Sequence, residues 1–293
     1  MDKIMKRIMV ISLFMLISNN GYTHAGGQDA NGGHVERSTG LYHCHANDCV
    51  PVTNEVEEDV EDPPDTIEGT PVTLGGSWST TKKWARDIIY AGVDKTFYCG
   101  CTYNAKGTSG GTTKPDSCGY DGASEKHQHR AETLEWEHVV PASLMPARGF
   151  TCWNEGLPEC SKGSRKCCEK YDLNARAQIF DLHNLVPSVG QVNALRGNKR
   201  YGIIEGEVHK LGSCDFEWSN DLTEPPEDKR GEVARVWLYF VAQHNLQLQP
   251  GELLMYLRWS NDDPPEQWEF DRNERIQLKQ GNGNPFVEMF VQQ

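Results

Sequence analysis

Residues 135–141 read Glu-Trp-Glu-His-Val-Val-Pro, and this stretch places a carboxylate, Glu137, directly beside an imidazole, His138. Tryptophan and valine favour extended backbone, and a residue that precedes proline is disfavoured in the helical region. We therefore expect a short strand that ends before Pro141. A carboxylate can hold a hard cation, and a neutral histidine can accept a proton from water near pH 7. Because neighbours on a regular strand point to opposite faces, both groups serve one site only if the strand ends or bulges there.

A second polar stretch, residues 181–193, reads Asp-Leu-His-Asn-Leu-Val-Pro-Ser-Val-Gly-Gln-Val-Asn. Ser188 and Gln191 have the spacing of a capping box, which predicts a helix that begins after Ser188. The helix would run to about residue 196 and end near Gly197. Its apolar positions have helical spacing and predict a buried stripe, formed by Val189, Val192 and Leu195.

The polar residues of this stretch have different predicted roles. Asn193 offers a neutral oxygen ligand, and one amide plus one carboxylate would leave a Mg²⁺ ion open to water and to a substrate phosphate. We interpret Asp181, His183 and Asn184 as supporting residues, with His183 and Asn184 buried as braces of the strand–loop–helix junction.

Basic residues accompany both stretches. Residues 150–172 combine four cysteines with several cations, and the planar fork of Arg165 suits a phosphate oxygen. The alternative is a surface loop with solvated charges. Cations at the end of the predicted helix can hold a nucleic-acid backbone. The candidate contacts to that backbone are Lys166, Arg196, Lys199 and Arg200.

The start of the chain predicts export. Lys3, Lys6 and Arg7 precede an apolar run at residues 8–17 that is too short to span a bilayer, so residues 1–25 form a predicted signal peptide. All ten cysteines follow it, which favours disulfides in an oxidising compartment. Cys44 and Cys49 can close a local loop, and the other eight leave their connectivity open. Zinc binding is the weaker alternative, because the cysteine spacings lack the usual two-residue gap.

Composition divides the remaining chain into three parts. Residues 26–50 form a small Gly/His/Cys module that resembles modules ending in Tyr-His-Cys-His in exported bacterial proteins. Residues 51–75 are acidic and proline-rich, and predict a disordered linker or an acidic arm that mimics DNA. The net charge of −13 is concentrated there, since residues 26–75 hold eleven acidic residues and only Arg37 as a base. Residues 76–293 form the predicted main domain, in which local basic clusters remain compatible with nucleic acid.

Taken together, these motifs resemble the bacterial endonuclease I family of exported, disulfide-bonded nucleases. The matching segments span about residues 78–290, and they are residues 135–142, 165–168, 181–198, 274–276 and 284–287. The resemblance implies an α+β fold with a ββα-metal (His-Me finger) core and surrounding helices. It also implies a non-specific endonuclease that leaves 5′-phosphate ends and contacts mainly the DNA backbone, which carries no base identity.

The resemblance also assigns roles to individual residues. It implies that His138 is the general base, that Glu137 and Asn193 bind the metal, and that Arg165 contacts the scissile phosphate. The implied cofactor is Mg²⁺, with Mn²⁺ or Ca²⁺ as alternatives. Two positions depart from the family pattern. Ile179 replaces a frequent acidic residue, so a metal-bound water would serve as the general acid, and Ala194 replaces a glycine.

The sequence therefore predicts a periplasmic or secreted monomer that acts on DNA, with RNA as an alternative substrate, and that has no membrane segment after signal cleavage. Helices are expected at residues 79–91, 232–246, 251–259 and 265–278. Two other classes of function stay open: a non-enzymatic binding or adhesion module, and a metal phosphodiesterase that acts on small substrates.

Overall fold

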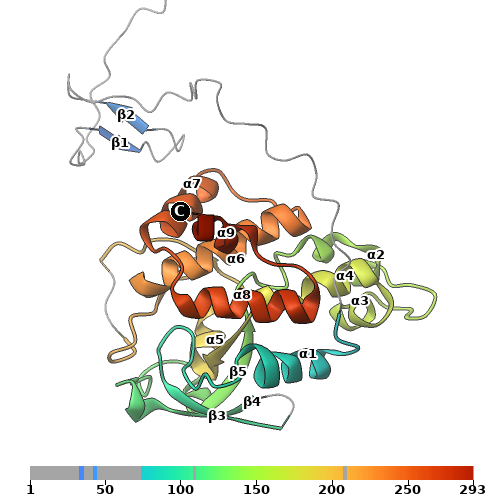
Figure 1. Ribbon diagram of the computed structural model, residues 1–293, viewed down its shortest axis with the longest axis horizontal. Coiled ribbons are helices and arrows are strands. Elements are labelled where there is room, and N and C mark those ends of the chain that lie inside the picture. The colour runs from blue at the N-terminus through green and yellow to red at the C-terminus, as the bar shows by residue number, and fades with distance from the viewer. Residues whose placement is uncertain (1–32, 36–41, 45–73, 108–109, 207–209, 293) are drawn as a thin grey trace, which may run out of the picture. The chain divides into compact units, whose positions relative to one another are not determined.

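The computed structural model describes residues 33–35, 42–44, 74–107, 110–206 and 210–292 (Figure 1). Contacts divide the chain into two units, residues 1–60 and 61–293. In the first unit, β1 (Gly33–Val35) and β2 (Tyr42–Cys44) form an antiparallel pair. The predicted signal peptide, the Cys44–Cys49 loop closure and the acidic linker up to residue 73 fall outside the described residues.

A four-stranded antiparallel sheet positions the stretch that opens the sequence analysis. Its order is β3 (Thr102–Lys106), β4 (Gly110–Lys114), β5 (Thr133–His138) and β6 (Leu185–Val189). As predicted, β5 ends at His138. The register pairs Glu137 with Val186 and His138 with Leu185, and so joins the two polar stretches of the sequence. A smaller sheet has the order β7 (Arg200–Tyr201), β9 (Leu222–Glu224) and β8 (Glu217–Trp218).

Helices surround these sheets and give an α+β fold, as expected. They are α1 (Trp78–Trp84), α2 (Thr151–Asn154), α3 (Arg165–Tyr171), α4 (Leu173–Ile179), α5 (Gly190–Arg196), α6 (Arg230–His244), α7 (Glu252–Asp262), α8 (Gln267–Gln280) and α9 (Pro285–Glu288). A π-helical segment, η1 (Ala85–Ile89), continues α1. Short 3₁₀ turns are η2 (Pro115–Ser117), η3 (Gln128–Arg130), η4 (Pro146–Gly149), η5 (Leu182–Asn184), η6 (Glu227–Lys229) and η7 (Met289–Gln292). In Figure 1, α6 to α9 gather on one side of the larger unit, and β3 and β4 lie on the other.

The C-terminal helices form most of the scaffold, in agreement with the predicted helices. Val233, Trp237 and Phe240 of α6 are buried in the main core, which continues onto β6 and α5. An ion pair fixes α6 to α8, because Arg235 donates two hydrogen bonds to Glu269 at 2.7 and 2.5 Å. No helix in the described part of the chain has the length and apolar character needed to cross a membrane.

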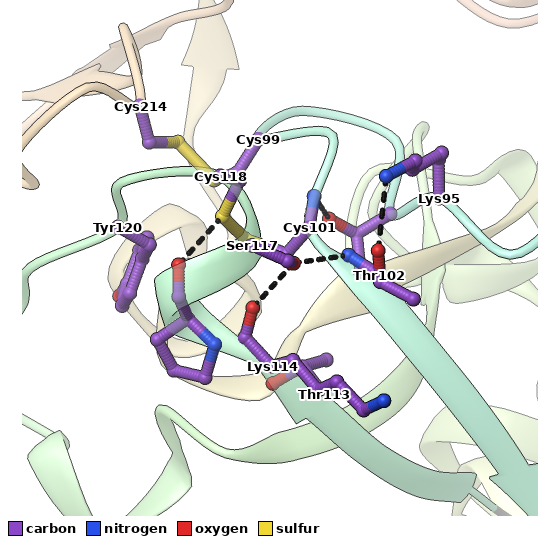
Figure 2. The surroundings of a disulfide bond; sticks show 12 residues. Lys95, Cys99, Cys101, Thr102, Thr113, Lys114, Ser117, Cys118, Tyr120 and Cys214 are labelled. Carbon is purple, nitrogen blue, oxygen red and sulfur yellow. Dashed lines mark hydrogen bonds between the residues drawn. A yellow bond between two sulfur atoms is a disulfide. The ribbon is translucent and has the colours of Figure 1, made fainter.

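The eight cysteines between residues 99 and 214 all form disulfides, which confirms the expected chemistry and supplies the connectivity. The bonds are Cys99–Cys214, Cys101–Cys118, Cys152–Cys168 and Cys160–Cys167. Figure 2 shows Cys99 and Cys101 leaving one loop for different partners. Nearby, the Ser117 hydroxyl donates to the Lys114 carbonyl at 2.6 Å and accepts from the Thr102 amide at 2.8 Å (Figure 2). This end of the sheet is therefore fixed covalently and by hydrogen bonds.

The start of α5 corrects one prediction. Ser188 does not cap the helix, because it lies buried within β6, and α5 begins at Gly190 without a side-chain cap. A Cβ at Gly190 would lie 2.8 Å from the Glu135 carboxylate, so glycine allows the helix to start directly against β5. The predicted end is confirmed, since Gly197 follows the last helical residue with φ of +59°.

Candidate active site

Glu137 is held by two neighbours through one of its two carboxylate oxygens. Its Oε1 accepts a hydrogen bond from the Tyr98 hydroxyl at 3.1 Å and lies 3.5 Å from Arg196 Nε. Its Oε2 is buried and has no hydrogen-bond partner among the residues that the structure describes. Burial raises the pKa of Glu137, and the positive charge of Arg196 opposes that shift. Tyr98 and Arg196 thus hold one carboxylate oxygen, and the Ser188 hydroxyl also acts on the carboxylate and opposes the rise of its pKa.

His138 is fixed in one tautomer. Its Nε2 lies 2.7 Å from the Ile179 carbonyl oxygen, which can only accept, so Nε2 carries the proton and Nδ1 carries the lone pair. The ring stacks on Trp78 with 4.8 Å between centroids. Burial, and then the charge of Arg165, lower the pKa of His138 to about 3. The imidazole is therefore neutral at pH 7 and can accept a proton at Nδ1.

Arg165 reaches the surroundings of His138 from the first turn of α3. The Ser164 side chain caps this helix by accepting from the Cys167 amide at 3.2 Å. The guanidinium of Arg165 lies 5.3 Å from the Trp78 ring centroid and forms an ion pair of 2.7 Å with Glu169. Trp78 thus contacts both the histidine and the arginine.

Asn193 projects from α5 toward β5 and is half-buried. Its Nδ2 donates to Glu135 Oε2 at 2.8 Å, which leaves the amide oxygen for another partner. Arg130 donates to both oxygens of Glu135 and forms an ion pair with it. The structure places Asn193 beside Glu135, two residues before Glu137 on the same strand.

Three of the four residues predicted to contact the nucleic-acid backbone have partners within the protein. The expectation that Arg196 contacts nucleic acid conflicts with its side-chain exposure of 2 % and its ion pair with Glu137. Lys199 donates to the Leu195 carbonyl at 2.7 Å, at the end of α5. Arg200 forms a 2.6 Å ion pair with Glu252. Lys166, by contrast, is exposed on α3.

Asn184 occupies the position of a brace. Its Oδ1 accepts from the Val140 amide at 2.6 Å, and its Nδ2 donates to the Val140 carbonyl at 3.0 Å. Both partners are buried and follow His138 closely in sequence. Asn184 therefore ties the end of β5 to the start of β6.

Asp181 and His183 belong to a separate buried polar cluster. Burial alone would raise the pKa of Asp181, but hydrogen bonds and nearby positive charge, chiefly from His244, hold it at about 2. Asp181 Oδ2 accepts from the Tyr239 hydroxyl and lies near His244 Nε2, both at 2.8 Å. His183 Nε2 lies 3.0 Å from the Asn282 carbonyl oxygen. These buried hydrogen bonds agree with the supporting role predicted for both residues.

The residues present fit a hard divalent cation. Among the described residues, no group of three or more His, Cys, Asp or Glu side chains could hold a metal ion. The unpartnered Oε2 of Glu137 and the available oxygen of Asn193 are nevertheless the types of ligand that Mg²⁺ takes while it keeps several waters.

Sequence reasoning missed three residues that contact the site. Glu135 could have been found, because it lies two residues before Glu137 and shares its strand face. Tyr98 contacts Glu137, and Trp78 contacts His138, and both pairs are distant in sequence. No local pattern indicates those two contacts.

A disulfide-bonded α+β fold that presents a neutral histidine, a carboxylate and an arginine suits a phosphodiester hydrolase, and the comparisons with known proteins identify its class. The Endonuclease I family profile matches residues 77–290. The chain belongs to the endonuclease I family, which confirms the resemblance carried by its motifs, and it is an endonuclease.

Three similar proteins support this assignment. A periplasmic deoxyribonuclease of Aeromonas hydrophila is 36 % identical over 205 residues, which are 68 % of this chain and 81 % of that protein. An extracellular deoxyribonuclease of Aeromonas hydrophila is 37 % identical over 205 residues, 68 % and 83 % of the two chains. Endonuclease-1 of Buchnera aphidicola subsp. Acyrthosiphon pisum is 35 % identical over 201 residues, 68 % and 76 % of the two chains.

Proposed function

We propose that this chain is an exported, divalent-metal-dependent endonuclease that hydrolyses phosphodiester bonds of DNA with His138 as the general base. The observation that carries the proposal is the fixed tautomer of His138, with Nε2 bound to the Ile179 carbonyl and Nδ1 available. The predicted signal peptide and the names of the periplasmic and extracellular relatives support export. RNA remains an alternative substrate.

A bound Mg²⁺, Mn²⁺ or Ca²⁺ ion would neutralise negative charge on the phosphate and on the leaving oxygen. Glu137 and Asn193 would hold it through Oε2 and the amide oxygen. We propose that β5, β6 and α5 together form the ββα-metal core, because β5 pairs with β6 and α5 follows β6 directly. Residues 76–293 would form the nuclease domain, and residues 26–50 a separate module.

The protein groups act on the water and on the phosphate. His138 Nδ1 accepts a proton from the attacking water, and the water oxygen forms a bond to phosphorus. The bond from phosphorus to the 3′ oxygen breaks, and the leaving oxygen takes a proton from a second water molecule. Arg165 stabilises the charge that develops on the phosphate oxygens. The products are a 5′-phosphate and a 3′-hydroxyl. Burial keeps the pKa of His138 low, so Nδ1 is unprotonated at pH 7 and has a lone pair that can accept a proton.

A pocket with two lysines in its lining lies next to the candidate site. This open pocket of about 600 Å³ is lined by Trp78, Lys82, Lys106 and Glu135, among others. We propose that Lys82 and Lys106, with exposed Lys166, contact flanking phosphates. Arg196 instead positions Glu137, and Lys199 and Arg200 stabilise the protein locally.

Plasmid cleavage tests the proposal. The wild-type protein should nick supercoiled DNA with Mg²⁺, and EDTA or His138→Ala should abolish nicking. His129→Ala is the matched control, because His129 is exposed and should leave activity unchanged. Circular dichroism verifies folding. Cleavage of a small diester without cleavage of plasmid would contradict the endonuclease assignment, and normal nicking by the His138→Ala protein would exclude His138 as the base.

A further inference from the structure

Two parallel contacts join α5 to β5. Glu135 and Glu137 are two residues apart on the strand, and Asn193 and Arg196 are three residues apart on the helix, so each pair shares one face of its element. Glu135 contacts Asn193 at 2.8 Å, and Glu137 contacts Arg196 at 3.5 Å. Each proposed metal ligand, Glu137 and Asn193, is thus anchored by a partner through one of its two polar atoms.

The anchor of Asn193 is directional. An ionised carboxylate only accepts hydrogen bonds, so Glu135 attracts the NH₂ group of Asn193 and repels its oxygen. Arg130 donates its Nε to Glu135 Oε1 at 2.8 Å and a second N–H to Oε2. These two hydrogen bonds from Arg130 fix the orientation of the Glu135 carboxylate. A rotated Asn193 amide would place two acceptor oxygens against each other.

We propose that Glu135 is a positioning residue that sets the orientation of the Asn193 amide, so that its oxygen rather than its nitrogen faces the divalent cation. The inference rests on the proposed function, because it presumes that Asn193 is a ligand. Both oxygens of Glu135 are already engaged, by Arg130 and Asn193, so Glu135 acts through Asn193 and does not contact the ion.

The start of α5 packs closely on β5 at Glu135. Gly190 begins the helix where a Cβ would lie 2.8 Å from Glu135 Oε1 and 3.0 Å from the Arg130 carbonyl oxygen. The start of α5 therefore lies directly against the Glu135 carboxylate. A partner that orients a metal ligand typically changes metal affinity about 10- to 100-fold when it is removed.

Mn²⁺ binding to the nucleic-acid-free full chain, measured by isothermal titration calorimetry, tests the proposal directly. We expect Glu135→Ala to weaken Mn²⁺ binding at least about tenfold. Glu135→Gln should have a smaller effect, because its side-chain oxygen can still accept from Asn193. The matched control is Glu132→Gln, which removes the same charge from an exposed position three residues earlier and should bind Mn²⁺ like wild type.

Cleavage kinetics supply a second readout. The Mn²⁺ concentration for half-maximal plasmid cleavage should rise in Glu135→Ala, while turnover at saturating Mn²⁺ should stay close to wild type. Wild-type Mn²⁺ affinity in Glu135→Ala would overturn the positioning role alone. A wild-type protein that binds no Mn²⁺ would overturn the metal site itself. If Glu135→Ala does not fold, the affinity of Glu135→Gln decides, and a value equal to that of Glu132→Gln overturns the role.

Discussion

His183 should make the protein less stable as the pH falls from 7 to 5. The ring is buried, and its Nε2 lies 3.0 Å from the Asn282 carbonyl oxygen, while its Nδ1 has no hydrogen-bond partner in the described part of the chain. A proton on Nδ1 would therefore be a buried donor without an acceptor. Burial lowers the pKa of His183 to about 4, with Arg272 acting in the same direction and Asp181 opposing.

The sign and size follow from linkage. In the unfolded chain His183 binds a proton with a pKa of about 6.5, whereas in the folded chain it does so with a pKa of about 4. The pH-dependent contribution of His183 to the free energy of unfolding is therefore complete above pH 6.5. It is lost as the pH falls and levels off below about 4. At about 1.36 kcal/mol per pH unit, His183 removes about 2 kcal/mol of stability between pH 7 and pH 5. His138 acts with the same sign, and the raised pKa of Glu137 partly offsets both.

Urea unfolding with intact disulfides, at pH 7 and at pH 5, measures this effect. His183→Gln removes the titrating group, so its stability should change between the two pH values by about 2 kcal/mol less than that of wild type. Comparing the two pH values cancels the constant effect of the substitution on packing. The control is His129→Gln, at an exposed histidine, which should keep the wild-type pH dependence. An unchanged pH dependence in His183→Gln would refute the argument.

Three further predictions concern activity and stability. Arg165→Lys should lower the rate of plasmid cleavage by about 10- to 100-fold, since an ammonium cannot make the two parallel contacts of a guanidinium. Equal cleavage rates for Arg165→Lys and wild type would exclude a specific arginine contact. Asn184→Ala should lower the free energy of unfolding, measured by urea denaturation, by about 3 kcal/mol, because it leaves the buried amide and carbonyl of Val140 unpaired. Replacing both Cys99 and Cys214 by serine should lower the unfolding free energy by about 4 to 5 kcal/mol, because this disulfide closes a loop with a sequence separation of 115. A change below about 1 kcal/mol would contradict each of the last two estimates.

The sequence predicted the elements that have strong local signals. Three features follow from local signals: the strand that ends at His138 from β-propensity, the end of α5 from the glycine at position 197, and the C-terminal helices from helical periodicity. The capping prediction at Ser188 was wrong because strand pairing with Glu135 overrides a weak local pattern. Disulfide chemistry was predictable, but partners such as Cys99 and Cys214 were not, since they meet only in the folded chain.

The residues of the candidate site could be proposed from the sequence, but the contacts between them could not. Glu137, His138 and Asn193 stand in recognisable motifs, whereas the ion pair that buries Arg196 depends on how α5 packs against β5. A sequence pattern shows that a cation follows a helix, and it does not show whether that cation faces solvent or an acid beneath it. The role of Arg196 therefore had to be revised once its side chain was placed.

The neighbouring cysteines Cys167 and Cys168 bind different partners, Cys160 and Cys152, so one bond is nested inside the other. Exchanging the two partners would give crossed bonds from the same four thiols, with almost no change in loop length. Chain entropy therefore discriminates poorly between the native arrangement and its scrambled isomer. Thiol–disulfide exchange, guided by the packing of α2 against α3, must select the native pairing, and renaturation in a redox buffer should recover more enzyme than rapid air oxidation.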